Sequence, residues 1–151
     1  MKIYNYEIST LEIPNEISLC FNVTGCNVKC IDCHSKFLWN IDNGWELDFE
    51  YFSKILEKYS NYISYVCFMG GEWFEEDLIK MLKISKEKGL KNCLFTGRND
   101  IKENIKQYLD LLKLGGFIKE LGGLESLNTN QKMIELKTGN CLNYLFQKNT
   151  N

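Results

Sequence analysis

The sequence has 151 residues, a length that suits one domain and buries roughly 70% of the unfolded chain's surface. Its 44% hydrophobic and 25% charged residues are typical of a soluble globular protein, and a net charge of −2 without a basic stripe argues against nucleic acid as the main partner. No apolar run reaches the length of a signal peptide or a transmembrane helix, so we expect a cytoplasmic protein with no membrane partner.

The first half of the chain contains stretches with the periods of strands and helices. Residues 17–23 alternate apolar and polar side chains, as a strand does, and a loop follows over 25–44. Apolar residues recur at helical spacing over 49–59, and the continuous apolar run 63–69 is typical of a strand covered on both faces. This run ends at the glycine pair 70–71.

The second half continues this alternation. A helix is predicted from the acidic residues at 75–77, which suit a helix N-terminus, to a stop at Gly89. The remaining predicted elements are a strand over 92–96, a helix over 100–112, and strands over 117–121 and 133–136.

Strands and helices in this order form right-handed parallel βαβ units. About five to six mainly parallel strands are too few for a closed eight-stranded barrel, so we predict an α/β fold with an open partial (β/α) barrel, as a single domain over 1–151. Functional residues of such folds collect at the carboxyl ends of the strands. The segments that follow the first three strands, the cysteine loop after Gly25, Gly70–Glu72 and Thr96–Arg98, should therefore share one face.

The loop after the first strand holds a cluster of cysteines. The chain has seven cysteines, and in a reducing compartment this odd number does not indicate a disulfide framework. Cys26, Cys30 and Cys33 fall within eight residues, and so short a loop can wrap an iron–sulfur cubane and reach three of its corners. The next cysteine, Cys67, lies in a predicted buried strand, so one iron would stay open to another ligand.

Other interpretations of these cysteines stay open. A structural zinc site needs four ligands, and the candidate for the fourth is His34, although a residue directly after Cys33 rarely binds the same ion. Core cysteines without any metal are the remaining alternative. The scattered Cys20, Cys67 and Cys93 lie in apolar runs and are predicted to be core residues.

Two features resemble signatures of the radical S-adenosylmethionine (SAM) superfamily: the Cys-x3-Cys-x2-Cys loop after the first strand, and the Gly-Gly-Glu motif after the second. In that superfamily, SAM chelates the open iron, and reduction cleaves it to a 5′-deoxyadenosyl radical that abstracts hydrogen. We predict Cys26, Cys30 and Cys33 as cluster ligands, and the predicted cofactor-binding residues are Asp32, His34, Gly70, Gly71, Glu72 and Thr96.

Several of these residues also suit purely structural roles. A glycine pair serves any strand-to-helix turn that needs positive φ, His34 is equally suited to structuring its loop, and Thr96 to a turn before a helix. Asp32 stands where many related enzymes have an aromatic residue that stacks near adenine. Stacking would then come from another residue, such as Phe37 or Trp39.

Longer segments resemble a short subgroup of anaerobic (class III) ribonucleotide reductase activating proteins. This resemblance implies a radical SAM oxidoreductase with a [4Fe–4S] cluster and SAM as cofactors, which forms a glycyl radical on the large reductase subunit. Flavodoxin or ferredoxin is the expected reductant. The segments are 14–39, 69–73, 89–98, 108–117 and 121–131, and the last includes Asn130 and Gln131, whose role the sequence does not indicate.

Three other functions remain open on the sequence alone. A radical SAM enzyme for a small molecule, such as a deazaguanine-forming enzyme, has the same motifs, but 151 residues leave little chain to enclose a substrate pocket. A small iron–sulfur electron carrier favours a fully ligated cluster and gives Glu72 no role. A zinc-binding interaction module is the third; iron and sulfide analysis separates it from the rest, and SAM cleavage separates the carrier from the enzymes.

Overall fold

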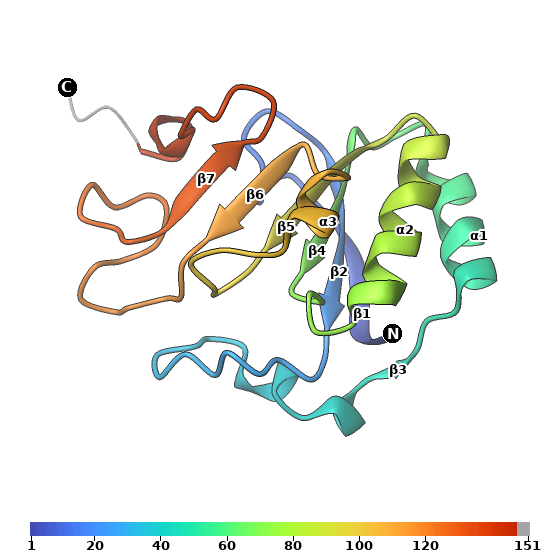
Figure 1. The fold of residues 1–151 in the computed structure, drawn as a ribbon, viewed down its shortest axis with the longest axis horizontal. Coiled ribbons are helices and arrows are strands. Elements are labelled where there is room, and N and C mark those ends of the chain that lie inside the picture. The colour runs from blue at the N-terminus through green and yellow to red at the C-terminus, as the bar shows by residue number, and fades with distance from the viewer. Residues whose placement is uncertain (148–151) are drawn as a thin grey trace.

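A computed structural model describes residues 1–147, which form one mixed sheet of seven strands with helices packed on one face (Figure 1). The strands lie in the order β3-β1-β2-β4-β5-β6-β7. Their bounds are β1 Lys2–Ser9, β2 Ser18–Val23, β3 Trp45–Glu46, β4 Tyr65–Met69, β5 Lys91–Phe95, β6 Leu111–Leu114 and β7 Lys132–Glu135. The α-helices are α1 Phe49–Tyr59, α2 Glu75–Glu87 and α3 Glu103–Lys106, and short 3-10 helices cover Lys36–Leu38, Ile41–Asn43 and Asn143–Leu145.

The centre of the sheet is parallel and its edges are antiparallel. Strands β2, β4, β5 and β6 pair in parallel, whereas β1 and β3 on one side and β7 on the other pair antiparallel. The α/β class that the sequence predicts is therefore confirmed. Strands β1 and β3, on one side of the sheet, are not predicted from the sequence. The carboxyl ends of the parallel strands meet at one edge of the sheet, next to the loop between β2 and β3 (Figure 1).

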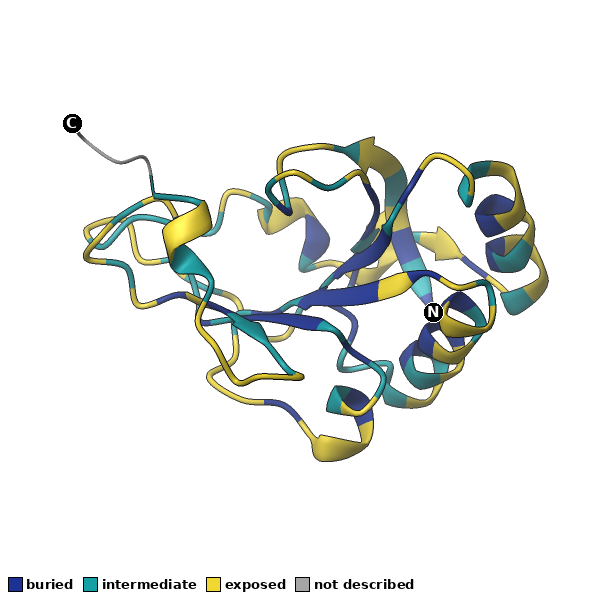
Figure 2. Cartoon of the chain, turned by 90° about the horizontal axis from the view of Figure 1, so that it is seen from above, coloured by how far each residue is buried: buried dark blue, intermediate teal, exposed yellow. Residues whose placement is uncertain are grey.

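Each face of the sheet has its own hydrophobic core. On the helical face, the ring centroid of Phe52 in α1 lies 5.2 Å from that of Phe21 in β2 and 6.0 Å from that of Phe68 in β4. The opposite face carries three buried cysteines at paired register positions, Cys20, Cys67 and Cys93. The prediction that these are core residues is confirmed, and the dark blue central strands in Figure 2 show that both faces are covered.

Local signals explain the two helices that flank β4. Asp48 caps α1, because its Oδ1 accepts a hydrogen bond from the backbone N–H of Tyr51 at 2.7 Å. Helix α2 begins with acidic residues over 75–77 and ends shortly before Gly89, whose φ is 75°. Both predicted helices are confirmed. None of the helices in the described part of the chain is long and apolar enough to cross a membrane.

The predicted helix over 100–112 is wrong except for one turn. Helix α3 covers only Glu103–Lys106, and Leu111 and Leu112 lie in β6. Leucines at these positions suit a helical face and a doubly buried strand equally well. The two leucines form a strand because they pair with Cys93 and Leu94 of β5 and so extend the parallel sheet.

The predicted strand over 117–121 is also wrong. The segment turns back on itself, because the N–H groups of Leu121 and Gly122 both donate to the carbonyl of Ile118 at 3.0 Å. A single bridge between Ile118 and Gly122 is all that remains of strand pairing there. The predicted strand over 133–136 is confirmed as β7, although it is antiparallel to β6.

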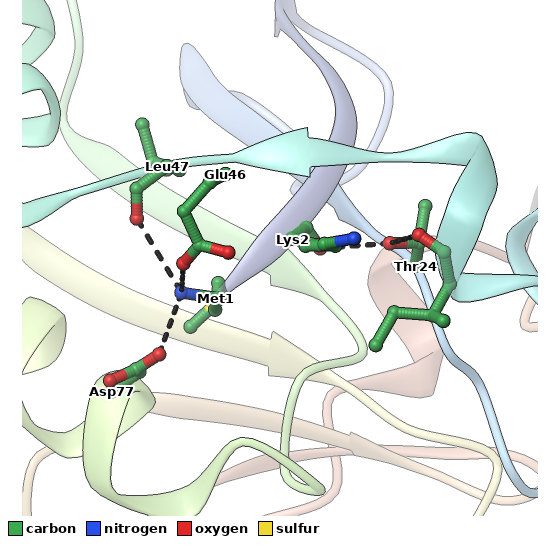
Figure 3. A network of polar contacts seen from close by, with 7 residues as sticks. Met1, Lys2, Thr24, Glu46, Leu47 and Asp77 are labelled. Atoms are coloured by element: carbon green, nitrogen blue, oxygen red, sulfur yellow. Dashed lines mark hydrogen bonds and ion pairs between the residues drawn. The ribbon is translucent and has the colours of Figure 1, made fainter.

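The α-ammonium group of Met1 joins β1 to two other segments (Figure 3). Its nitrogen lies 2.8 Å from Glu46 Oε1 in β3 and 2.6 Å from Asp77 Oδ2 in α2. Burial by itself lowers the pKa of this ammonium, but the hydrogen bonds and charges of Asp77 and Glu46 outweigh that effect and raise the pKa above its ordinary 8.0. The contact therefore connects the β1–β3 side of the sheet to the first turn of α2.

Candidate functional site

A cavity of about 280 Å³ opens at the carboxyl ends of the parallel strands. Its walls come from the ends of β2, β4, β5 and β6 and from the loop between β2 and β3. The prediction that three distinctive segments share one face is confirmed, because each of them contributes to this cavity. The predicted site residues that line it are Cys26, Cys30, Cys33, His34, Gly70, Glu72 and Thr96.

The cysteine loop is held in place by its own backbone. The N–H groups of Gly25 and Cys26 donate to the carbonyl of Leu38, at 2.8 and 3.1 Å. Gly25 has a φ of 83° and Lys29 a φ of 51°, so the chain turns sharply just before Cys26 and again just before Cys30. The loop thus closes on itself and presents its three thiols to the cavity.

Two glycines at strand ends make room for Cys30. A Cβ atom at Gly97, just after β5, would lie 3.2 Å from Cys30 Sγ, and one at Gly116, just after β6, would lie 2.8 Å from it. Neither glycine has a positive φ. Their lack of a side chain therefore serves the close approach of the sulfur and not an unusual backbone conformation.

The donor set fits a [4Fe–4S] cluster. All three cysteines are free thiols that are neither fully buried nor fully exposed, and Cys33 Sγ accepts a hydrogen bond from the N–H of Ser35 at 3.3 Å. Hydrogen bonds to ligand sulfurs are one of the features that set cluster potentials. Within residues 1–147, no three His, Cys, Asp or Glu side chains converge as the ligands of a single ion do. A cubane instead distributes its thiolates over separate iron corners.

Glu72 brings a buried carboxylate with one free oxygen. Its side chain is 6% exposed, and Oε1 accepts hydrogen bonds from Thr96 Oγ1 at 2.5 Å and from Arg98 Nε at 3.2 Å. Oε2 is buried and has no hydrogen-bond partner among the residues that the structure describes. Because buried polar atoms are nearly always satisfied, this oxygen indicates a donor that residues 1–147 do not supply.

Gly70 and Gly71 adopt backbone conformations that favour glycine, with φ of 84° and 113°. A Cβ at Gly70 would lie 2.4 Å from the ring of Trp73, whose Nε1 donates to the carbonyl of Thr24 at 2.9 Å. A Cβ at Gly71 would lie 3.3 Å from Val23 Cγ2, and Gly71 does not line the cavity. The pair therefore packs the start of α2 against the end of β2 and aims Glu72 inward.

The aromatic and acidic residues of the loop have separate roles. Asp32 does not line the cavity, because its Oδ2 accepts a hydrogen bond from the N–H of Lys119 at 3.1 Å. The ring of His34 packs on Phe117 with a centroid distance of 4.5 Å, and both rings line the cavity. Trp39 also lines the cavity, and its buried Nε1 has no acceptor within residues 1–147.

One charged residue of the cavity was not predicted from the sequence. Lys113, in β6, is 9% exposed, and its Nζ donates to the carbonyl of Gly115 at 2.7 Å. Burial lowers the pKa of Lys113 to about 8, and the charge of Cys30 opposes that shift. The sequence signal that could have identified Lys113 is its position as the single charged residue in the apolar run 111–114.

Comparison with known proteins agrees with this donor set. A family described as a 4Fe-4S single cluster domain matches residues 17–136, which run from β2 to the end of β7. The pyruvate formate-lyase-activating enzyme of Clostridium pasteurianum is 34% identical over 99 residues, which cover 60% of this chain and 41% of the relative. The chain thus spans about two fifths of the length of that relative. Since the family match covers most of the sequence and includes all three clustered cysteines, the chain belongs to the 4Fe-4S single cluster domain family.

Proposed function

We propose that this protein is a radical SAM activating enzyme in which Cys26, Cys30 and Cys33 hold a [4Fe–4S] cluster. The observation that carries the proposal is that three thiols and the free oxygen of Glu72 share one cavity at the carboxyl ends of the parallel strands. The proposal is also supported by the position of the motifs, which follow the adjacent parallel strands β2, β4 and β5. The related pyruvate formate-lyase-activating enzyme supports an activating role.

Together, the cluster and SAM supply a one-electron reductive cleavage that yields a hydrogen-abstracting 5′-deoxyadenosyl radical. The residues of this chain bind and orient. Glu72 Oε2 would accept a hydrogen bond from the amino group of SAM, while Thr96 and Arg98 hold the other carboxylate oxygen in place. Trp39 Nε1, which has no acceptor within residues 1–147, would donate to the nucleoside end of SAM.

The cavity also limits the access of water to the site. Its walls include the apolar side chains of Val28, Leu38, Phe95 and Phe117. Exclusion of water protects a reactive intermediate from side reactions. Ile31, between two of the cysteines, is 85% exposed and offers apolar surface that a protein partner would cover.

The proposed hydrogen donor is a backbone glycine of a partner protein, the large subunit of anaerobic ribonucleotide reductase. This choice rests on the segments that resemble activating proteins of that reductase. Flavodoxin or ferredoxin is the proposed reductant, and the cytoplasm is the proposed location.

The test is to mix the anaerobically reduced protein, SAM and the cognate reductase and to record the electron paramagnetic resonance spectrum. A glycyl radical doublet that requires all three clustered cysteines is expected. SAM cleavage without any radical on the reductase, together with turnover of a small molecule, would instead assign the protein to the small-molecule radical SAM enzymes.

A further inference from the structure

The cavity holds a buried cation that no carboxylate of the described chain neutralises. Lys113 is the one lysine or arginine that residues 1–147 bury. Its ammonium group takes part in none of the ion pairs formed within those residues. A buried charge without a counter-charge is costly, so its presence indicates an anion at this place.

The surrounding residues hold the ammonium where it is. Nζ of Lys113 donates to the carbonyl of Gly115 at 2.7 Å, and Gln131 Nε2 donates to the same oxygen at 3.3 Å. Gly115 has a φ of 96°, and a Cβ there would lie 3.0 Å from the carbonyl oxygen of Asn130. This turn after β6 therefore needs glycine and presents its carbonyl to both donors.

The same turn places Lys113 close to a cysteine. Gly116, the residue after Gly115, lies against Cys30 Sγ, as the 2.8 Å approach of its hypothetical Cβ shows. Lys113 and Cys30 line the same cavity, and the charge of Cys30 acts on the Lys113 ammonium. The cysteine thiolates that ligate an iron–sulfur cluster would therefore supply the negative charge next to the Lys113 ammonium.

We propose that Lys113 is the counter-cation of the iron–sulfur site and raises the reduction potential of the cluster. Reduction adds one electron, and hence one negative charge, to a group whose potential depends on nearby charge. A fixed ammonium in the same cavity as the cysteines stabilises the reduced state more than the oxidised state. The inference rests on cluster ligation by the three cysteines but not on SAM cleavage.

The experiment compares Lys113→Met with Lys29→Met, which removes the same charge from an exposed position one residue before Cys30. The midpoint potential of each reconstituted protein is measured without SAM, by titration with dithionite as the electron donor, through the signal of the reduced cluster. Lys113→Met should lower the potential. Lys29→Met should leave it close to that of the original protein, because solvent screens an exposed charge.

The melting temperature of the cluster-free proteins separates this role from a structural one. Lys113→Met should melt at the same or a higher temperature, because it removes a buried charge that has no carboxylate partner. If Lys113→Met fails to hold iron, the midpoint potential is measured on Lys113→Gln instead. Loss of iron in both variants with an unchanged melting temperature would also support the proposal.

An unchanged potential in Lys113→Met would overturn the proposal. Weaker binding of SAM together with that unchanged potential would show that the ammonium serves a carboxylate of the ligand instead. A lower melting temperature of the cluster-free variant with an unchanged potential would show a purely structural lysine.

Discussion

Glu72 is the residue whose hydrogen bonds say most about the ligand of the site. One of its carboxylate oxygens has two donors from the end of β5, and the other has none within the described residues. The fixed oxygen orients the free one, so Glu72 is held ready for a cationic or amino donor before any ligand arrives. Preorganisation of this kind reduces the entropic cost of binding.

Glu72→Gln should weaken SAM binding by roughly 10-fold or more, because a hydrogen bond to a charged group contributes about 1.5–3 kcal/mol. Binding is measured by equilibrium dialysis on the cluster-loaded protein. Glu76→Gln is the matched control, since Glu76 lies in the first turn of α2 and does not line the cavity. Equal SAM affinity in Glu72→Gln and the original protein would remove Glu72 from the binding site.

Single residues also show where sequence reasoning stops. Gly71 belongs to a motif that resembles a cofactor-binding signature, yet its φ of 113° and its contact with Val23 give it a packing role. Asp32 forms a bridge from the cysteine loop to Lys119, 87 residues later in the chain. Neither contact has a local sequence signal, because each depends on the approach of segments that only the fold brings together.

At the scale of elements, the ends of β5 and β6 shape the place of Cys30. Gly97 and Gly116 follow these strands and leave space that the cysteine sulfur fills. The sequence predicts β5 and the cysteine loop but assigns β6 to a helix. Local periodicity favours the helix, and only the pairing of β6 with β5 and β7 selects the strand. The cavity wall that β6 provides, including Lys113, therefore could not be predicted.

Gly116→Ala should lower the iron content of the reconstituted protein while the chain stays folded. The added Cβ would approach Cys30 Sγ to 2.8 Å and displace a cluster ligand, whereas the backbone at this position tolerates a side chain. Iron and sulfide per chain are measured, and circular dichroism reports the fold. Full iron loading in Gly116→Ala would mean that Cys30 points elsewhere when it binds the cluster.

The control for this variant is Lys132→Ala, a change at an exposed position of β7 outside the cavity. Because it alters the same half of the sheet without approaching a cysteine, it should load iron fully. A similar loss of iron in both variants would point to general weakening of the β6–β7 pair.

At the scale of the whole molecule, ion pairs as well as packing hold the β1–β3 side of the sheet in place. The ammonium group of Met1 links β1, β3 and the first turn of α2 through Glu46 and Asp77 (Figure 3). This side was not predicted, because the contact joins residues 45 and 76 positions apart in the sequence. Three of the four parallel strands, β2, β4 and β5, were predictable from local signals such as the alternation over 17–23 and the apolar run 63–69.

The contact of the Met1 ammonium should therefore contribute less to the stability of the fold at alkaline pH. The pKa of the Met1 ammonium is raised above 8.0 in the folded state, so its contribution is complete below pH 8 and is lost as the pH rises through the folded-state pKa. Urea unfolding of the original protein and of Asp77→Asn between pH 7 and pH 10 measures this loss, which is modest because Asp77 is 37% exposed. The difference between their free energies of unfolding should shrink as the pH rises, and the titration of Lys113 cancels in that difference. A difference that stays constant would exclude the contact.

The central claim is that the three-thiol cavity holds a [4Fe–4S] cluster that cleaves SAM reductively. The most direct measurement is the yield of 5′-deoxyadenosine from SAM after anaerobic reconstitution and reduction with dithionite. About four iron and four sulfide per chain and formation of 5′-deoxyadenosine are expected. Ser at position 26, 30 or 33 should abolish both, while Cys67→Ala, in the buried row of thiols, should preserve both. Stoichiometric zinc with no iron loading, or a reducible cluster that leaves SAM intact, would contradict the account.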